Sequence, residues 1–137
     1  MSFIQRQRLL RPALVAAIAW TAAAQAGAQP EPHMPTPAEL MAMPEYCQAK
    51  LGTNQALHDQ WRTRMGPELF MHLHHFCHGL KHMRRATSMV DAQKRRYQYE
   101  RASAEFDYVL QRWPADFQLY ATAKQQQQLA RTFLGHK

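Results

Sequence analysis

Apolar side chains follow the period of a helix along most of the chain after position 37. The densest stripe steps by four, three, four and three residues and consists of Leu69, Leu73, Phe76, Leu80 and Met83. Such spacing places side chains on one face of an α-helix. No convincing alternation of apolar and polar residues, the mark of a strand, occurs in the sequence. The pattern therefore predicts an all-α fold.

Helix-start and helix-stop residues divide this pattern into five segments, which cover 37–52, 54–65, 68–86, 90–113 and 115–134. Thr36-Pro37-Ala38-Glu39 has the pattern of a capping box, and Pro44 interrupts the first segment. Gly66-Pro67 and Pro114 end two of the later segments. Because short loops join antiparallel neighbours, we expect a small antiparallel helical domain with short flanking helices.

The first 28 residues have the order of a cleavable secretory signal. Arg6, Arg8 and Arg11 precede an apolar run, and Ala26-Gly27-Ala28 is the small-x-small pattern before a cleavage site. The run is shorter than the about 20 residues that a spanning helix needs. We therefore predict a signal peptide over 1–28 and a periplasmic or secreted product without a transmembrane segment.

Two further regions follow the predicted signal. Residues 29–36 are rich in proline and are expected to form a flexible leader. Residues 37–137 are expected to form the helical domain. A mature chain of this size suits one domain with a modest core.

Charge adds little evidence for a nucleic-acid partner. Removing residues 1–28 removes three arginines and no acid, which lowers the net charge from +7 to +4. The basic clusters are short, and lie at 81–85 and 94–96. We interpret them as solvated helix faces, with contact to an acidic partner or an anionic membrane surface as the alternative. No nucleic-acid partner is expected.

Cys47 and Cys77 are the two cysteines of the chain. In an exported protein such a pair usually forms a disulfide. Both lie in segments with helical spacing, so the bond would connect two helices. The alternative is that the thiols are free or bind metal, since histidines flank Cys77.

Five of the eight histidines lie between positions 72 and 82. His74, His78 and His82 follow each other at four-residue steps, and imidazoles at such spacing bind one ion from one helix face. Cu or Zn would suit these ligands. Two other interpretations remain: His74 or His75 hydrogen-bonds a backbone or acidic group at a helix crossing, or the histidines form a pH-sensitive surface.

The later helices resemble a tetratricopeptide repeat. The string Ala102-x-x-x-Phe106-x-x-Val109-Leu110-x-x-x-Pro114 is similar to the second helix of that repeat, and Gly79-Leu80 lies where the first helix is crossed. The small residue lets the paired helix approach and the aromatic residue fills the groove. About three repeats are usual for independent stability, whereas this chain has one pair and part of a second.

A wider set of strings resembles an exported bacterial family of tetratricopeptide-repeat-like proteins. The strings are Pro44-Glu-Tyr-Cys47, His74-His75-Phe-Cys77-x-Gly79-Leu80, Arg85-Ala86 and Glu105-Phe-Asp-Tyr-Val-Leu110. The resemblance covers roughly residues 44–134. It implies a helical domain and brings no assured activity with it.

These observations favour a binding protein over an enzyme. The sequence has no Ser-His-Asp arrangement, no phosphate-binding glycine loop and no His-Glu-x-x-His. We expect a periplasmic tetratricopeptide-like binding or scaffold module for another envelope protein or peptide, with no cofactor. The alternative is a periplasmic Cu- or Zn-binding protein that uses the histidine-rich helix 72–82.

Overall fold

The computed structural model describes residues 32–135. These residues belong to one compact unit that begins at Glu31, and the other unit, Met1–Pro30, lies outside the described part of the chain. The predicted signal peptide over 1–28 and the first residues of the predicted leader therefore fall outside the description. The described part is all-α, as the sequence predicts.

Three short helices come first: α1 (Pro37–Met41), α2 (Glu45–Leu51) and α3 (Gln55–Met65). The capping box is confirmed at α1, where Thr36 Oγ1 accepts the Glu39 amide at 3.2 Å and the Glu39 carboxylate accepts the Thr36 amide at 2.7 Å. Asn54 caps α3 through its side-chain oxygen. The first predicted segment thus becomes two helices, because Pro44 precedes α2 and cannot continue α1.

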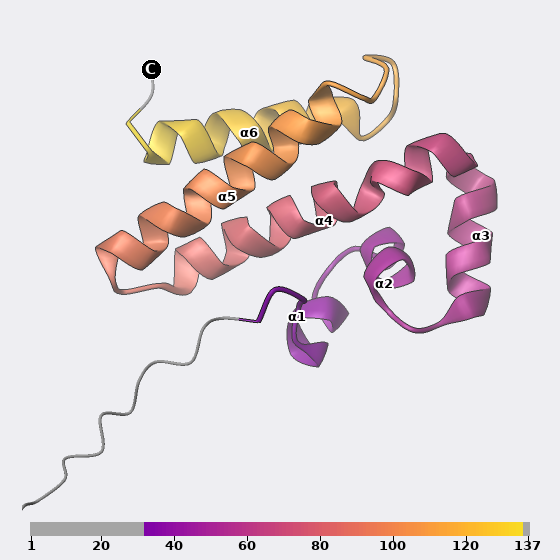
Figure 1. Cartoon of the computed structure of the whole chain (residues 1–137), viewed down its shortest axis with the longest axis horizontal. Coiled ribbons are helices and arrows are strands. Elements are labelled where there is room, and N and C mark those ends of the chain that lie inside the picture. Colours follow the sequence, from indigo (N-terminus) through magenta and orange to yellow (C-terminus); the bar gives the residue numbers. More distant parts are fainter. Residues whose placement is uncertain (1–31, 136–137) are drawn as a thin grey trace, which may run out of the picture. The chain divides into compact units, whose positions relative to one another are not determined.

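Three longer helices follow: α4 (Pro67–Ser88), α5 (Ala92–Leu110) and α6 (Tyr120–Phe133). Gly66 joins α3 to α4 with φ +86°, a left-handed conformation that glycine adopts without steric cost. Figure 1 shows α4, α5 and α6 as successive antiparallel neighbours, with α5 packed on both of the others. The helices α2 and α3 pack on α4, and α1 contacts α2.

The connection between α5 and α6 is longer than predicted. The helix ends at Leu110 rather than near 113, and α6 begins at Tyr120 rather than near 115. Pro114 disfavours helical backbone at the residue before it, and Trp113 turns into the core, where Nε1 donates to the Leu69 carbonyl at 3.3 Å. The segment after Leu110 is not helical, and its backbone conformation allows the Trp113 ring to be buried in the core.

The core lies between α4 and α5. Phe76, Phe106 and Trp113 form its aromatic centre, with ring centroids 5.5–5.8 Å apart along the two contacts of Phe76. Gly79 of α4 faces Phe106 of α5, and a Cβ atom at Gly79 would lie 2.7 Å from that ring. Glycine at this position therefore allows the close crossing of α4 and α5.

None of the helices within residues 32–135 combines the length and the apolarity that crossing a membrane requires.

Candidate functional site

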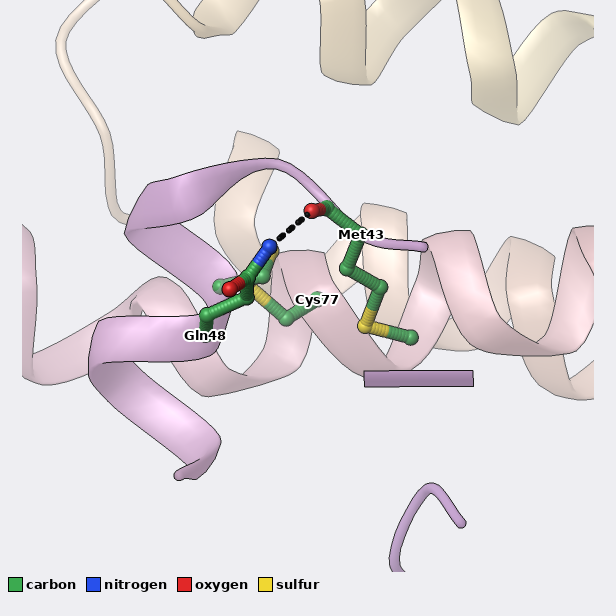
Figure 2. The surroundings of a disulfide bond; sticks show 4 residues. Met43, Gln48 and Cys77 are labelled. Atoms are coloured by element: carbon green, nitrogen blue, oxygen red, sulfur yellow. Dashed lines mark hydrogen bonds between the residues drawn. A yellow bond between two sulfur atoms is a disulfide. The ribbon is translucent and has the colours of Figure 1, made fainter. Parts of the chain in front are cut away.

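The predicted disulfide joins α2 to α4. Cys47 and Cys77 are bonded, with their Cα atoms 5.5 Å apart and both side chains fully buried. Beside the bond, the Gln48 side chain donates to the Met43 carbonyl at 2.8 Å (Figure 2), which ties the α1–α2 turn to α2. Cys77 is therefore not available as a thiolate ligand. The cross-link connects the short N-terminal helices covalently to the longest helix.

The three histidines that the sequence groups as candidate metal ligands have separate partners. His74 Nδ1 donates to the Met71 carbonyl at 2.9 Å, whereas His78 Nδ1 accepts from Lys81 Nζ at 3.2 Å. His82 Nδ1 donates to Gln98 Oε1 of α5 at 2.6 Å. Within residues 32–135, no group of three His, Cys, Asp or Glu residues is placed to hold a metal ion.

Burial changes the proton affinity of these rings. It lowers the pKa of His78 to about 3 and that of His82 to about 4, and the neighbouring Lys81 cation adds to both effects. Burial also lowers the pKa of His74. Because His78 and His82 are neutral at physiological pH, their protonation belongs to the acidic range rather than to a switch near pH 7.

His75 follows the structural interpretation, whereas His74 bonds a carbonyl within its own helix. His75 Nδ1 donates to Glu105 Oε2 at 2.6 Å, and its ring stacks on Tyr108 with centroids 3.5 Å apart. Both partners lie on α5, so this contact spans the crossing of two helices, as expected for a histidine that bonds an acid there. Glu105 also accepts from Arg101 at 3.3 Å.

The basic cluster at 81–85 differs from its sequence interpretation as a solvated face. Lys81 is 1% exposed and Arg85 is also buried. Arg85 donates to both carboxylate oxygens of Glu39, at 2.6 and 2.8 Å, and this pair holds the pKa of Glu39 down to about 2. The spacing of residues within one helix does not reveal contacts from other helices. The carboxylate that covers Arg85 lies 46 positions earlier in the sequence.

Residues 32–36, which we call the strap, cover this polar part of α4. Lys81 Nζ donates to the His33 carbonyl, and Arg85 donates to the carbonyls of Pro32 and Met34, at 2.8 and 3.3 Å. The His33 ring lies 4.9 Å from the His78 ring. These contacts restrict a part of the leader that the sequence predicts to be flexible.

A second feature is a groove of about 690 Å³ on the outer side of α5 and α6. Its lining residues come from α5, from α6 and from the residue that follows α6. They are Glu100, Ser103, Ala104, Asp107, Gln128, Arg131, Thr132 and Leu134. Arg131 pairs with Asp107 at 2.9 Å and so connects the two helices. The sequence does not mark these residues as a site, because most of them are ordinary polar or small residues with no motif spacing.

The residues that sequence reasoning missed on the polar side are Glu39, Gln98, Arg101 and Glu105. Glu39, Gln98 and Glu105 contact Arg85, His82 and His75 of α4 across a helix boundary. Arg101 instead pairs with Glu105 within α5. No local spacing links the three contacts between helices, whereas the four-residue step from Arg101 to Glu105 is the spacing of a helical ion pair. No protein-family model, curated protein or solved structure matches the chain.

Proposed function

We propose that this chain is an exported, tetratricopeptide-like binding module that receives a helix of another envelope protein. The observation that supports the proposal is the groove on the outer side of α5 and α6. Both α5 and α6 line it, so a helix bound there would contact both of them. The modest size of the repeat-like unit, one helix pair and part of a second, favours completion by a partner.

The lining residues of the groove indicate the chemistry of a suitable partner. Ser103 and Ala104 are small, so a helix can approach α5 closely over this stretch. The charged lining residues are Glu100, Asp107 and Arg131, which leaves one more carboxylate than cation. An amphipathic helix with small and basic residues on its contact face fits this surface.

The disulfide supports the export part of the proposal. Protein disulfides persist in oxidising compartments and are rare in reducing ones. The Cys47–Cys77 bond is buried and connects two helices, which suits a structural cross-link. A periplasmic or secreted location agrees with both the cross-link and the predicted signal.

Site-specific photo-crosslinking in cells tests the docking face. A photoreactive residue at Gln128, in the groove, should crosslink to one defined envelope protein. The same residue at Phe133, exposed on α6 but outside the groove lining, should not. The captured protein is then purified and its direct binding is measured with the wild-type chain.

Filling the groove provides the matched variant. Ala104→Trp places a large ring in the groove, whereas Ala121→Trp adds the same ring to an exposed position of α6 outside its lining. We expect only the first substitution to abolish binding of the captured protein. Equal crosslinking from positions 128 and 133, or equal binding by both tryptophan variants, would rule out this docking face.

A further inference from the structure

A small cavity opens between the strap, α4 and α5. Its volume is about 200 Å³, and its lining residues are Pro32, His33, His82, Arg85, Tyr97, Gln98 and Arg101. Among residues 32–135, no carboxylate belongs to this lining. The described lining therefore presents donors and cations.

His82 supplies an observation that is independent of the cavity's charge. Its side chain is 6% exposed, and Nδ1 is engaged by Gln98. Nε2 is buried and has no hydrogen-bond partner among the described residues. A buried polar nitrogen left without a partner costs free energy, part of which a ligand that bonds Nε2 recovers.

The charges around His82 favour an anion. Three cations surround it, Lys81 and Arg85 on α4 and Arg101 on α5. Two carboxylates oppose them: Glu39 of α1, which pairs with Arg85, and Glu105 of α5, which Arg101 contacts at 3.3 Å. Among the described residues this balance leaves one positive charge beside the cavity, and a partly enclosed cavity attracts an anion more strongly than an open surface does.

We infer that this cavity binds a small oxyanion, a carboxylate or a phosphate group, between Arg101 and His82. Arg101 is the anchor, because its side chain is 43% exposed while Arg85 is already engaged by Glu39 and by two strap carbonyls. A guanidinium suits such a group because its planar donors match two oxygen atoms. The cavity volume is large enough for one such group.

Binding of the anion is coupled to one proton. With Nδ1 donating to Gln98, the neutral ring has a lone pair at Nε2, which repels an oxyanion. The ring therefore takes one proton from solvent at Nε2 as the anion enters, and Nε2–H donates to it. The charged groups around His82 are Lys81, Arg85 and Arg101, which oppose this proton, and Glu105, which favours it.

Calorimetric titration of the purified protein with sodium acetate and, separately, with inorganic phosphate measures the binding. At constant ionic strength we expect saturable binding of at least one of the two anions with one site per chain. Affinity should rise as pH falls from neutral toward 5.5. Comparison of acetate with phosphate identifies which oxyanion the cavity prefers.

Two arginines on α5 offer a matched pair of variants. Arg101 and Arg96 each pair with a glutamate four residues later, Glu105 and Glu100, but Arg101 alone of the two lines the cavity. Arg101→Gln should weaken anion binding by about tenfold or more, since charge-assisted hydrogen bonds contribute about 1.5–3 kcal/mol. Arg96→Gln should leave the affinity unchanged.

The nitrogen spectrum of selectively labelled histidine gives a readout that needs no variant. On addition of the anion that binds, the Nε2 signal of His82 should move from the unprotonated to the protonated range. His82→Gln, which cannot take up the proton, should bind without the pH dependence. Absence of saturable binding for both anions, equal weakening by the two arginine variants, or an unchanged Nε2 signal overturns the inference.

Discussion

The two halves of α4 are held by different kinds of interaction. The first half buries Phe70, Leu73, Phe76 and the disulfide-bonded Cys77. The second half buries His78, Lys81, His82 and Arg85 under the strap, α1 and α5. The buried contacts of the first half are mainly packing and a covalent bond, whereas those of the second half depend on ionisable groups and on partners that are distant in sequence. One helix therefore combines a buried contact that does not titrate with one that does.

Removal of the disulfide tests the first half and has the largest expected effect. The bond closes a loop of 30 residues, and its loss should lower the free energy of unfolding by about 3–4 kcal/mol in the chain-entropy model. Urea unfolding of the Cys47→Ala/Cys77→Ala variant measures this. Reduced wild-type protein is the control that separates the cross-link from the lost side-chain packing. An unchanged unfolding midpoint in both samples would show that the cross-link does not stabilise this half.

Glu39→Gln tests the second half and ranks next. The substitution leaves the Arg85 guanidinium buried without its carboxylate, so we expect a loss of about 1–3 kcal/mol in thermal or urea unfolding. Glu100→Gln removes an exposed carboxylate that also pairs with an arginine and is the control. If the two variants lose equal stability, the buried pair contributes no more than a surface pair and the contrast between the halves fails.

Lowering the pH should destabilise the second half of α4 through protonation of His82. The folded pKa of His82 lies near 4, below the ordinary 6.5, so the unfolded chain binds more protons between these values and stability falls as pH decreases through this window. Between pH 7 and pH 5.5 this effect lowers the free energy of unfolding by about 1 kcal/mol. Over that range in a low-anion buffer, the free energy of unfolding of the wild-type protein should fall by this amount more than that of the His82→Gln variant. Parallel losses would show that His82 does not cause the pH dependence.

A further acid step belongs to the Glu39–Arg85 pair. The pKa of Glu39 is lowered from 4.5 to about 2, so the stability from this carboxylate is complete above 4.5 and is lost as pH falls toward 2. The Glu39→Gln variant should lack this step, which urea unfolding over that range measures. Persistence of the same step in the variant would assign it to another carboxylate.

Arg96→Gln gives the smallest expected effect and sets the baseline for a solvated ion pair. Arg96 and Glu100 are 59% and 51% exposed, so the loss should not exceed about 0.5 kcal/mol. A larger loss, measured by the same unfolding experiment, would mean that exposed charge on α5 stabilises the fold and would weaken the distinction between buried and surface pairs.

Much of the fold was predictable from local patterns. Thr36 and Asn54 mark helix starts because their side chains accept the first free amides, and the structure confirms both. The apolar stripe of α4 and the Cys47–Cys77 bond are also confirmed. The stretch after Leu110 was not predicted, because the burial of Trp113 against Leu69 is a tertiary contact that outweighs helix propensity.

The candidate sites were harder to predict for a physical reason. Regular histidine spacing describes where the Cβ atoms lie on α4, but each ring turns toward the nearest available partner, such as Gln98 or Lys81. Burial of Lys81 and Arg85 depends on strap carbonyls and on Glu39, which are distant in sequence. The groove on α5 and α6 arises only when two helix surfaces are placed side by side.

The covalent ring between Cys47 and Cys77 also determines what a protease can release. A cut within the turn at Gly52–Asn54 falls inside the ring, so both pieces remain joined as one molecule under non-reducing conditions. A cut at Met89–Asp91 falls outside it and separates α5 and α6 from the remainder. A cut between Cys47 and Cys77 therefore releases no fragment, whereas after a cut at 89–91 the helices that form the proposed docking groove depend on noncovalent contacts alone to stay attached.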